Sequence, residues 1–152
     1  MLLVLLAPWA AQAQQPKTLT VYDSNCGTCS PQTPVNAQYQ MQKCQFIIPA
    51  DQLVDMEQQT ITKMTFRASA QDFHFQGFEV YLMEVDATSL STFYDVDQEP
   101  DASLVYSGDL DVEASTSNMD VVFTNPYHYN GGNLLVSFWK NHSEGSTQEW
   151  TM

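Results

Sequence analysis

Apolar residues recur at every second position along much of this chain, and this period constrains the fold more than any other feature of the sequence. In residues 77–85, for example, Phe78, Val80 and Leu82 share one phase. A period of two is typical of a strand that buries one face, whereas a helix on a core repeats its apolar residues every three or four positions. The pattern therefore predicts a chain built of β-strands.

Seven segments carry this alternation or are apolar runs of strand length. They are residues 19–23, 39–49, 60–69, 77–85, 104–108, 118–124 and 133–139. The last segment is apolar on both faces, as in a central strand. Helical patterns are weak: residues 49–59, with Asp51 as a candidate N-cap, and residues 87–94 are each long enough for one or two turns. The fold class is therefore predicted to be all-β, an antiparallel β-sandwich of the jelly-roll kind.

The first residues have the form of an export signal. Residues 2–7 are an unbroken apolar run that is too short to span a bilayer, and Ala11-Gln12-Ala13 has the small-x-small pattern of a signal-peptidase site. We therefore expect residues 1–13 to be a signal peptide that lacks its basic n-region. A buried N-terminal strand is the alternative. The protein is then secreted or held at the cell surface, with no membrane span in the mature chain.

Residues 14–152 are expected to form one β-sandwich domain. Because the polar stretch after residue 140 leads into what looks like another strand at Gln148, we expect this domain to lack its last strands. The chain carries 18 acidic and 5 basic residues, a formal net charge of -13. Such a surface repels phosphate backbones and anionic membranes, so nucleic acid is excluded as an expected partner.

Four motifs occur in order between residues 18 and 140, within residues 44–55, 61–66, 80–90 and 123–136. Their order and spacing resemble a jelly-roll module that is repeated in secreted and surface proteins of Bacteroidetes-type bacteria and is similar to cleaved-adhesin modules. The resemblance implies a non-catalytic β-sandwich attached to larger secreted enzymes or adhesins, and it supplies no catalytic residue. The chain departs from the pattern at Cys44, where a small polar residue is usual, and in its C-x-x-C pair.

The fourth motif contains Asn130-Gly131-Gly132-Asn133, which predicts a tight turn before the last strand. Glycine and asparagine tolerate the positive φ angles that hairpin and bulge turns require. The functional alternative is that the glycines clear space for a sugar ring.

Four acidic residues stand at every second position of one loop: Asp95, Asp97, Glu99 and Asp101. Oxygen ligands at this spacing are typical of the first half of a calcium loop, but Pro100 and Tyr106 stand where an EF-hand needs glycine and glutamate. Two interpretations stay open, an irregular structural calcium site and a solvated acidic loop. No other cofactor is expected.

Aromatic side chains are the best sequence evidence for a binding role. Trp139 is out of phase with its apolar neighbours on the last strand, so it is predicted to face outward. Exposed aromatic rings stack on the apolar face of sugars and anchor protein interfaces. We expect Trp139, Tyr129 and Trp150 to be the binding residues. The alternative is that these rings belong to the core or cover a sheet.

These observations predict a non-catalytic, adhesin-like or carbohydrate-binding accessory module of a larger secreted or surface protein. Its partners would be a glycan or a cell-surface protein, and other domains of the same polypeptide. The competing function is a structural spacer or protein-interaction domain with no ligand of its own. A hydrolase fragment is the third alternative, but the sequence has no G-x-S-x-G motif, and His74, His128 and His142 lack a recognisable partner motif, so no enzyme is expected.

The three cysteines lie close together in the sequence. Cys26 and Cys29 form a C-x-x-C pair, but the following Ser-Pro-Gln-Thr-Pro blocks the helix that a thioredoxin-like motif needs. Zinc would require a second ligand pair. In an exported protein we therefore predict a Cys26–Cys29 disulfide with Cys44 as a buried thiol. A bond from Cys26 or Cys29 to Cys44, and three free thiols, stay open.

Overall fold

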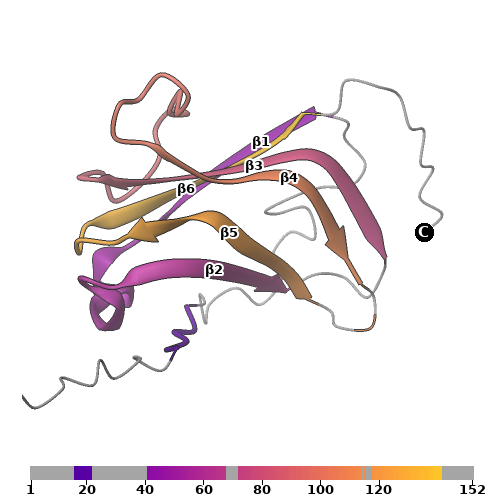
Figure 1. The fold of residues 1–152 in the computed structure, drawn as a ribbon. Coiled ribbons are helices and arrows are strands. Elements are labelled where there is room, and N and C mark those ends of the chain that lie inside the picture. Colours follow the sequence, from indigo (N-terminus) through magenta and orange to yellow (C-terminus); the bar gives the residue numbers. More distant parts are fainter. Residues whose placement is uncertain (1–15, 22–40, 68–71, 114, 116–117, 142–152) are drawn as a thin grey trace, which may run out of the picture.

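The computed structural model describes residues 16–21, 41–67, 72–113, 115 and 118–141, and in this part of the chain it contains six strands and two short 3-10 turns (Figure 1). The strands are β1 Met41–Ile48, β2 Thr60–Arg67, β3 Phe73–Val85, β4 Ser103–Val112, β5 Asn118–His128 and β6 Asn133–Asn141. The turns are η1 Ala50–Gln52 and η2 Val54–Met56. The predicted all-β class is confirmed.

The strands form two antiparallel sheets. Sheet A has the order β1-β6-β3-β4, and sheet B consists of β2 and β5. Figure 1 shows the two sheets stacked, with β4 curving down toward β5. A bridge between Glu113 and Asn118 joins the ends of β4 and β5. Farther along, Thr124 Oγ1 donates to the Val105 carbonyl at 3.2 Å and Asn125 Nδ2 donates to the Leu104 carbonyl at 3.0 Å. Side chains thus connect the sheets where the backbone ladder stops.

The main core lies between the sheets, and Phe138 of β6 is at its centre. Its ring stacks on Phe46 of β1 at a centroid distance of 6.0 Å and meets Phe66 of β2 edge-on at 5.1 Å. Phe78 of β3 lies 5.6 Å away. One ring therefore contacts aromatic residues from three other strands and from both sheets. Packing of this kind contributes about 0.5–1.5 kcal/mol per aromatic pair beyond the buried area.

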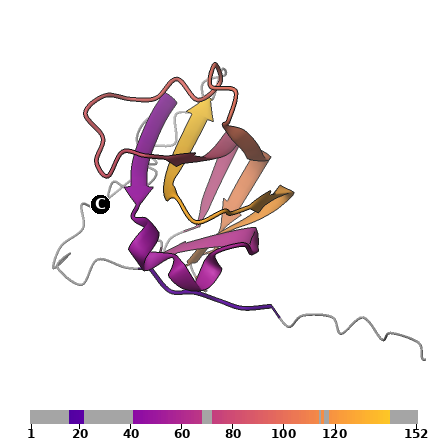
Figure 2. The ribbon, with the colours of Figure 1, turned by 90° about the vertical axis from the view of Figure 1, so that its left-hand side faces the viewer.

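A second, smaller core lies on the other face of sheet A. It is formed by Met83, Leu135 and Val96, the last from the loop of residues 86–102. This loop lies over the outer face of sheet A in Figure 1, and Figure 2 shows it crossing β1. Because β6 has cores on both sides, both of its faces are apolar, which confirms the sequence-based prediction of a central strand.

Two segments differ from the sequence-based expectations. Residues 19–23 were expected to form a strand, but the described residues 16–21 have no regular secondary structure, and Leu19 and Val21 pack against the main core. Residues 87–94 form bends instead of a helical turn. Individual apolar residues of both segments pack against a core, so neither segment needs regular secondary structure to bury them.

Residues 49–59 do form short helical turns, as predicted, namely η1 and η2. Asp51 is not an N-cap, because that position is held by Pro49, whose ring cannot donate or accept a capping hydrogen bond. In the described part of the chain, no helix is long and apolar enough to span a membrane.

Candidate functional site

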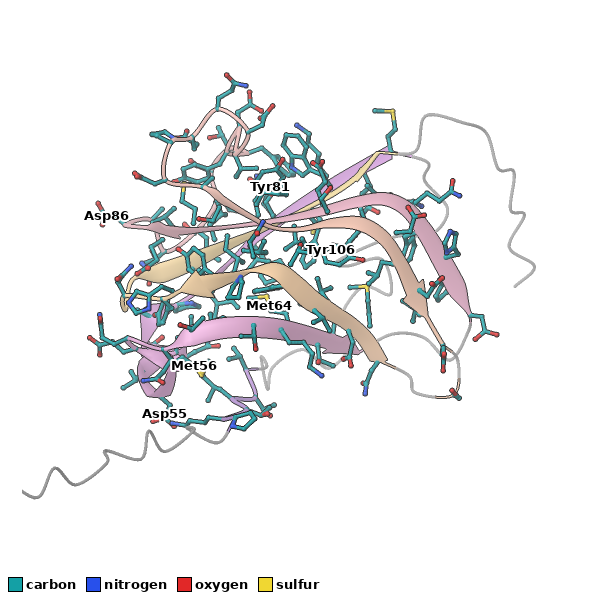
Figure 3. The ribbon with its side chains drawn as sticks, viewed as in Figure 1. Asp55, Met56, Met64, Tyr81, Asp86 and Tyr106 are labelled. Carbon is teal, nitrogen blue, oxygen red and sulfur yellow. The ribbon has the colours of Figure 1, made fainter. Side chains whose placement is uncertain are left out.

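Trp139 lies on the outer face of sheet A, the side that sequence phase predicts. β6 runs between β1 and β3, and Trp139 pairs with Lys43 on β1 and with Glu79 on β3. Residues that pair directly across antiparallel strands present their side chains on the same face. Tyr81 lies two residues along β3 from Glu79, and Figure 3 shows it on the side of sheet A that faces away from sheet B. We call Lys43, Glu79, Tyr81 and Trp139 the Trp139 patch.

The indole ring of Trp139 has a close neighbour from each flanking strand. Lys43 Nζ lies 3.4 Å from the ring centroid. The Tyr81 ring centroid lies 5.4 Å away with an interplanar angle of 48°. Because β6 lies between β1 and β3, these two neighbours come from the strands on either side of it. The ring is half-buried.

A buried polar network holds this indole in place. Trp139 Nε1 donates to Ser137 Oγ at 3.1 Å, and Gln45 Nε2 donates to the same oxygen at 3.0 Å. Gln45 also clamps the backbone of Tyr94, accepting from its N–H and donating to its carbonyl, both at 2.8 Å. The network therefore links the loop, β1 and β6, and it fixes the orientation of Trp139.

Gln45 and Ser137 are the two polar side chains that the described part of the chain buries. Burying polar groups costs free energy unless they are hydrogen-bonded, and here both belong to the network behind Trp139. Sequence reasoning missed them. The serine within the apolar run Leu134-Leu135-Val136-Ser137-Phe138 is the signal that could have found the network.

The surroundings of the patch are acidic. Lys43 Nζ lies 3.8 Å from Asp95 Oδ1, and the Tyr81 hydroxyl donates to Glu79 Oε2 at 3.1 Å. Burial, the hydrogen bond to Glu79 and the charges of Glu79 and Asp97 raise the pKa of Tyr81 to about 12. The hydroxyl is therefore neutral at physiological pH. The two rings thus have one ammonium group beside them, Asp95 next to that ammonium, and Glu79 bonded to the Tyr81 hydroxyl.

Tyr129, predicted to stack on a ligand, is instead fully buried. It continues the odd-numbered phase of Val121 and Phe123, so the alternation of β5 carries it into the core. Its hydroxyl donates to the Gly132 carbonyl at 2.7 Å. The prediction for Tyr129 is wrong, because a buried ring offers no face to a sugar. Trp150 lies outside the described residues.

The acidic loop is not gathered into a metal site. Asp95, Asp97, Glu99 and Asp101 are all exposed. Among the residues that the structure describes, no three His, Cys, Asp or Glu side chains converge in a way that could hold a metal ion. The geometry therefore favours the solvated acidic loop over the calcium site.

Cys26 and Cys29 lie outside the described residues, so the predicted disulfide stays a prediction. Cys44 is a free thiol that packs against the main core, but it is half-buried and not fully buried as predicted. Burial raises the pKa of this thiol.

The turn at residues 130–133 is a corner between the sheets, because β5 belongs to sheet B and β6 to sheet A. Glu84 of β3 holds it: Oε1 accepts from Asn130 N and Nδ2, both at 2.8 Å, and Oε2 accepts from Gly132 N at 2.7 Å. Gly131 has φ +117°, and a Cβ there would lie 3.1 Å from Glu57 Cγ. Because the two glycines lack a Cβ, the side chains of Glu57 and Glu84 can lie close to the turn.

An open hollow of about 450 Å³ lies beside this corner, lined by Glu84, Asp101, Ser103, Tyr127, His128 and Asn130. Burial alone would raise the pKa of Glu84, but hydrogen bonds from Asn130 and the glycines outweigh it and lower the pKa. Because both oxygens of Glu84 are occupied by the turn, its carboxylate is a structural group.

His74 is an exposed, hydrogen-bonded residue of β3. Its Nδ1 lies 2.6 Å from Asp111 Oδ1 and its Nε2 lies 4.0 Å from Asp109 Oδ2. The hydrogen bond to Asp111 raises the pKa of His74. The cluster is a solvent-exposed ion pair, which contributes little to stability.

No model of a known protein family matches the chain, and neither a curated protein nor a solved structure matches it. The resemblance to cleaved-adhesin modules therefore stays a prediction, and the Trp139 patch is interpreted from its own geometry.

Proposed function

We propose that this domain is a non-catalytic binding module of a secreted or surface protein, and that it binds a glycan on the outer face of sheet A through Trp139. The observation that carries the proposal is the buried network of Ser137 and Gln45, which holds the indole in one orientation. A ring that is already ordered loses less conformational entropy when a ligand binds.

The chemistry around the indole suits a sugar. The apolar face of a pyranose ring stacks on an aromatic ring, and its hydroxyl groups need donors and acceptors at the rim. The patch supplies the Glu79 carboxylate and the Tyr81 hydroxyl. Since the indole N–H already donates to Ser137, the indole contributes its face and not its N–H.

The test is a glycan array probed with the wild-type protein and with Trp139→Ala. We expect a glycan class whose affinity falls about 30-fold in the variant, since a central aromatic residue of an interface contributes about 2 kcal/mol. Val122→Ala is the matched control, because Val122 is 60% exposed on sheet B and belongs to the opposite side of the domain. If no glycan binds, or if Trp139→Ala binds like wild type, the spacer or protein-interaction function takes its place.

A further inference from the structure

We infer that the Trp139 patch selects glycans that carry a free primary amine, and that Lys43 occupies the position of this amine when no ligand is bound. The inference rests on the proposed function and goes beyond it by naming the class of ligand. It starts from the ammonium group that the structure places on the indole.

One side of Trp139 is a cation site. Lys43 Nζ lies 3.4 Å from the ring centroid, well within the roughly 6 Å over which an aromatic ring attracts a cation. The Asp95 carboxylate lies 3.8 Å from the same nitrogen. Ring and carboxylate together therefore hold one positive charge at this point.

A ligand that stacks on this side of the ring has to displace Lys43. Tyr81 comes from β3 and Lys43 from β1, so the part of the ring that Lys43 covers is the part that a flexible side chain can vacate. Lys43 has a side-chain exposure of 50%, and its release into water requires no rearrangement of the sheet. A ligand can thus displace the Lys43 side chain while the Trp139 indole keeps its orientation.

The displacement has a different cost for neutral and cationic ligands. A neutral sugar loses the attraction between the ring, Asp95 and the ammonium without replacing it. An amino sugar that places its own ammonium there restores both interactions. Exposed cation–π contacts and exposed ion pairs each contribute a small free energy, which together amount to a preference of roughly three- to thirtyfold at low salt.

The remaining charges act in the same direction. Glu79 pairs with Trp139 across the sheet, and Asp97 lies close enough to Tyr81 to act on its hydroxyl. The whole chain has a formal net charge of -13. Glycans with carboxylate or sulfate groups are therefore repelled, while a glycan with an ammonium group is attracted.

The experiment compares two probes that differ only at the amine: the β-1,4-linked disaccharide of glucosamine and its N-acetylated counterpart. Binding is measured by calorimetry at about pH 6, where primary amines are protonated, in low and in high salt. The wild-type protein is expected to bind the free-amine disaccharide three- to thirtyfold more tightly, and salt is expected to reduce this preference.

Three variants and two controls separate the site from the general negative charge. Trp139→Ala keeps the net charge and is expected to lose binding of both disaccharides. Lys43→Ala removes the competing ammonium and is expected to raise both affinities by the same factor. Asp95→Asn is expected to reduce the preference for the amine. Lys17→Ala and Asp55→Asn are the matched controls, since this exposed pair, 3.6 Å apart, changes the net charge equally at a distant place.

The outcomes distinguish the inference from the proposed function. If both disaccharides bind equally and both depend on Trp139, the glycan site stands and the amine selectivity is refuted. If the preference persists in Trp139→Ala, it arises from the general charge and the inference is also refuted. If neither these disaccharides nor any glycan of the array binds, the proposed function fails and the inference fails with it.

Discussion

Replacing Gln45 by leucine should loosen the loop of residues 86–102 and leave Ser137 as the indole's remaining partner in the polar network. Leucine has a volume similar to that of glutamine but makes no hydrogen bonds. The substitution removes both hydrogen bonds to the Tyr94 backbone and the one to Ser137. It therefore cuts the connection between the loop and β1, while the apolar contacts of Val96 with sheet A stay in place.

The magnitude follows from the number of bonds lost. Three hydrogen bonds at about 1 kcal/mol each give a loss of about 3 kcal/mol. The added apolar surface of leucine recovers about 1 kcal/mol of this. The net loss in the free energy of unfolding is about 2 kcal/mol, which lowers Tm by about 4–8 °C in a domain of this size.

The assay combines urea unfolding with tryptophan emission. Emission is recorded in a background in which Trp9 and Trp150 are phenylalanine, so that Trp139 is the single tryptophan. In Gln45→Leu we expect a lower unfolding midpoint and, in the native protein, emission shifted to longer wavelength because the indole is more exposed to water. Gln98→Leu is the control, since Gln98 belongs to the same loop and is exposed.

The reasoning is refuted if Gln45→Leu unfolds within about 0.5 kcal/mol of the wild-type protein and its native emission is unchanged. That result would mean that the apolar contacts alone hold the loop and that the polar network does not position Trp139.

Three further predictions concern the core, the corner turn and the cysteines. Phe138→Ala should lower the free energy of unfolding by about 3–5 kcal/mol because the ring is 1% exposed. The control Val122→Ala should change this free energy by less than about 0.5 kcal/mol. Equal effects of the two substitutions in urea unfolding would contradict the described core. Glu84→Gln should cost about 1–2 kcal/mol at neutral pH, because an amide NH₂ cannot accept the Gly132 N–H. Since the pKa of Glu84 is lowered in the folded protein, its contribution to the free energy of unfolding is complete above the ordinary pKa of 4.5 and is lost as the pH falls through the lowered value. The free energy of unfolding should therefore fall less steeply with acid in Glu84→Gln than in the wild-type protein. Denatured, unreduced protein should show one reactive thiol, that of Cys44, and three reactive thiols would contradict the predicted disulfide. In the native protein, Cys44 should react slowly because burial raises the pKa of its thiol.

The strands were the most predictable part of the molecule because alternation is a local property. The segment 133–139 was identified as a central strand from its two apolar faces, and β6 is that strand. The same alternation, followed two residues beyond Tyr127, would have placed Tyr129 in the core. The ring of Tyr129 follows this phase and is fully buried, although it stands beside a turn.

The corner at residues 130–133 shows what turn chemistry leaves open. Asn and Gly residues predict a turn because they permit positive φ angles, and the turn is present. They do not predict whether the strands before and after the turn pair with each other. Here β5 pairs in sheet B and β6 in sheet A. The turn between them is anchored by Glu84, which lies 46 residues earlier in the chain.

The candidate site was predicted only in part, for a similar reason. The outward phase of Trp139 was visible in the sequence. The partners of its indole were not, because Gln45 has the phase of an exposed strand residue and is buried only by a loop 49 residues away. Long-range contacts of this kind decide which polar side chain is structural, and the local sequence does not contain them.

The central claim is that the outer face of sheet A around Trp139 is the binding face. The most direct measurement is a titration of ¹⁵N-labelled protein with the glucosamine disaccharide, followed by backbone and indole N–H resonances. We predict that shifts concentrate at the Trp139 indole and at the amides of Lys43 and Tyr81. Shifts that gather instead around the hollow at Glu84 and His128, with the Trp139 indole unchanged, would contradict the claim.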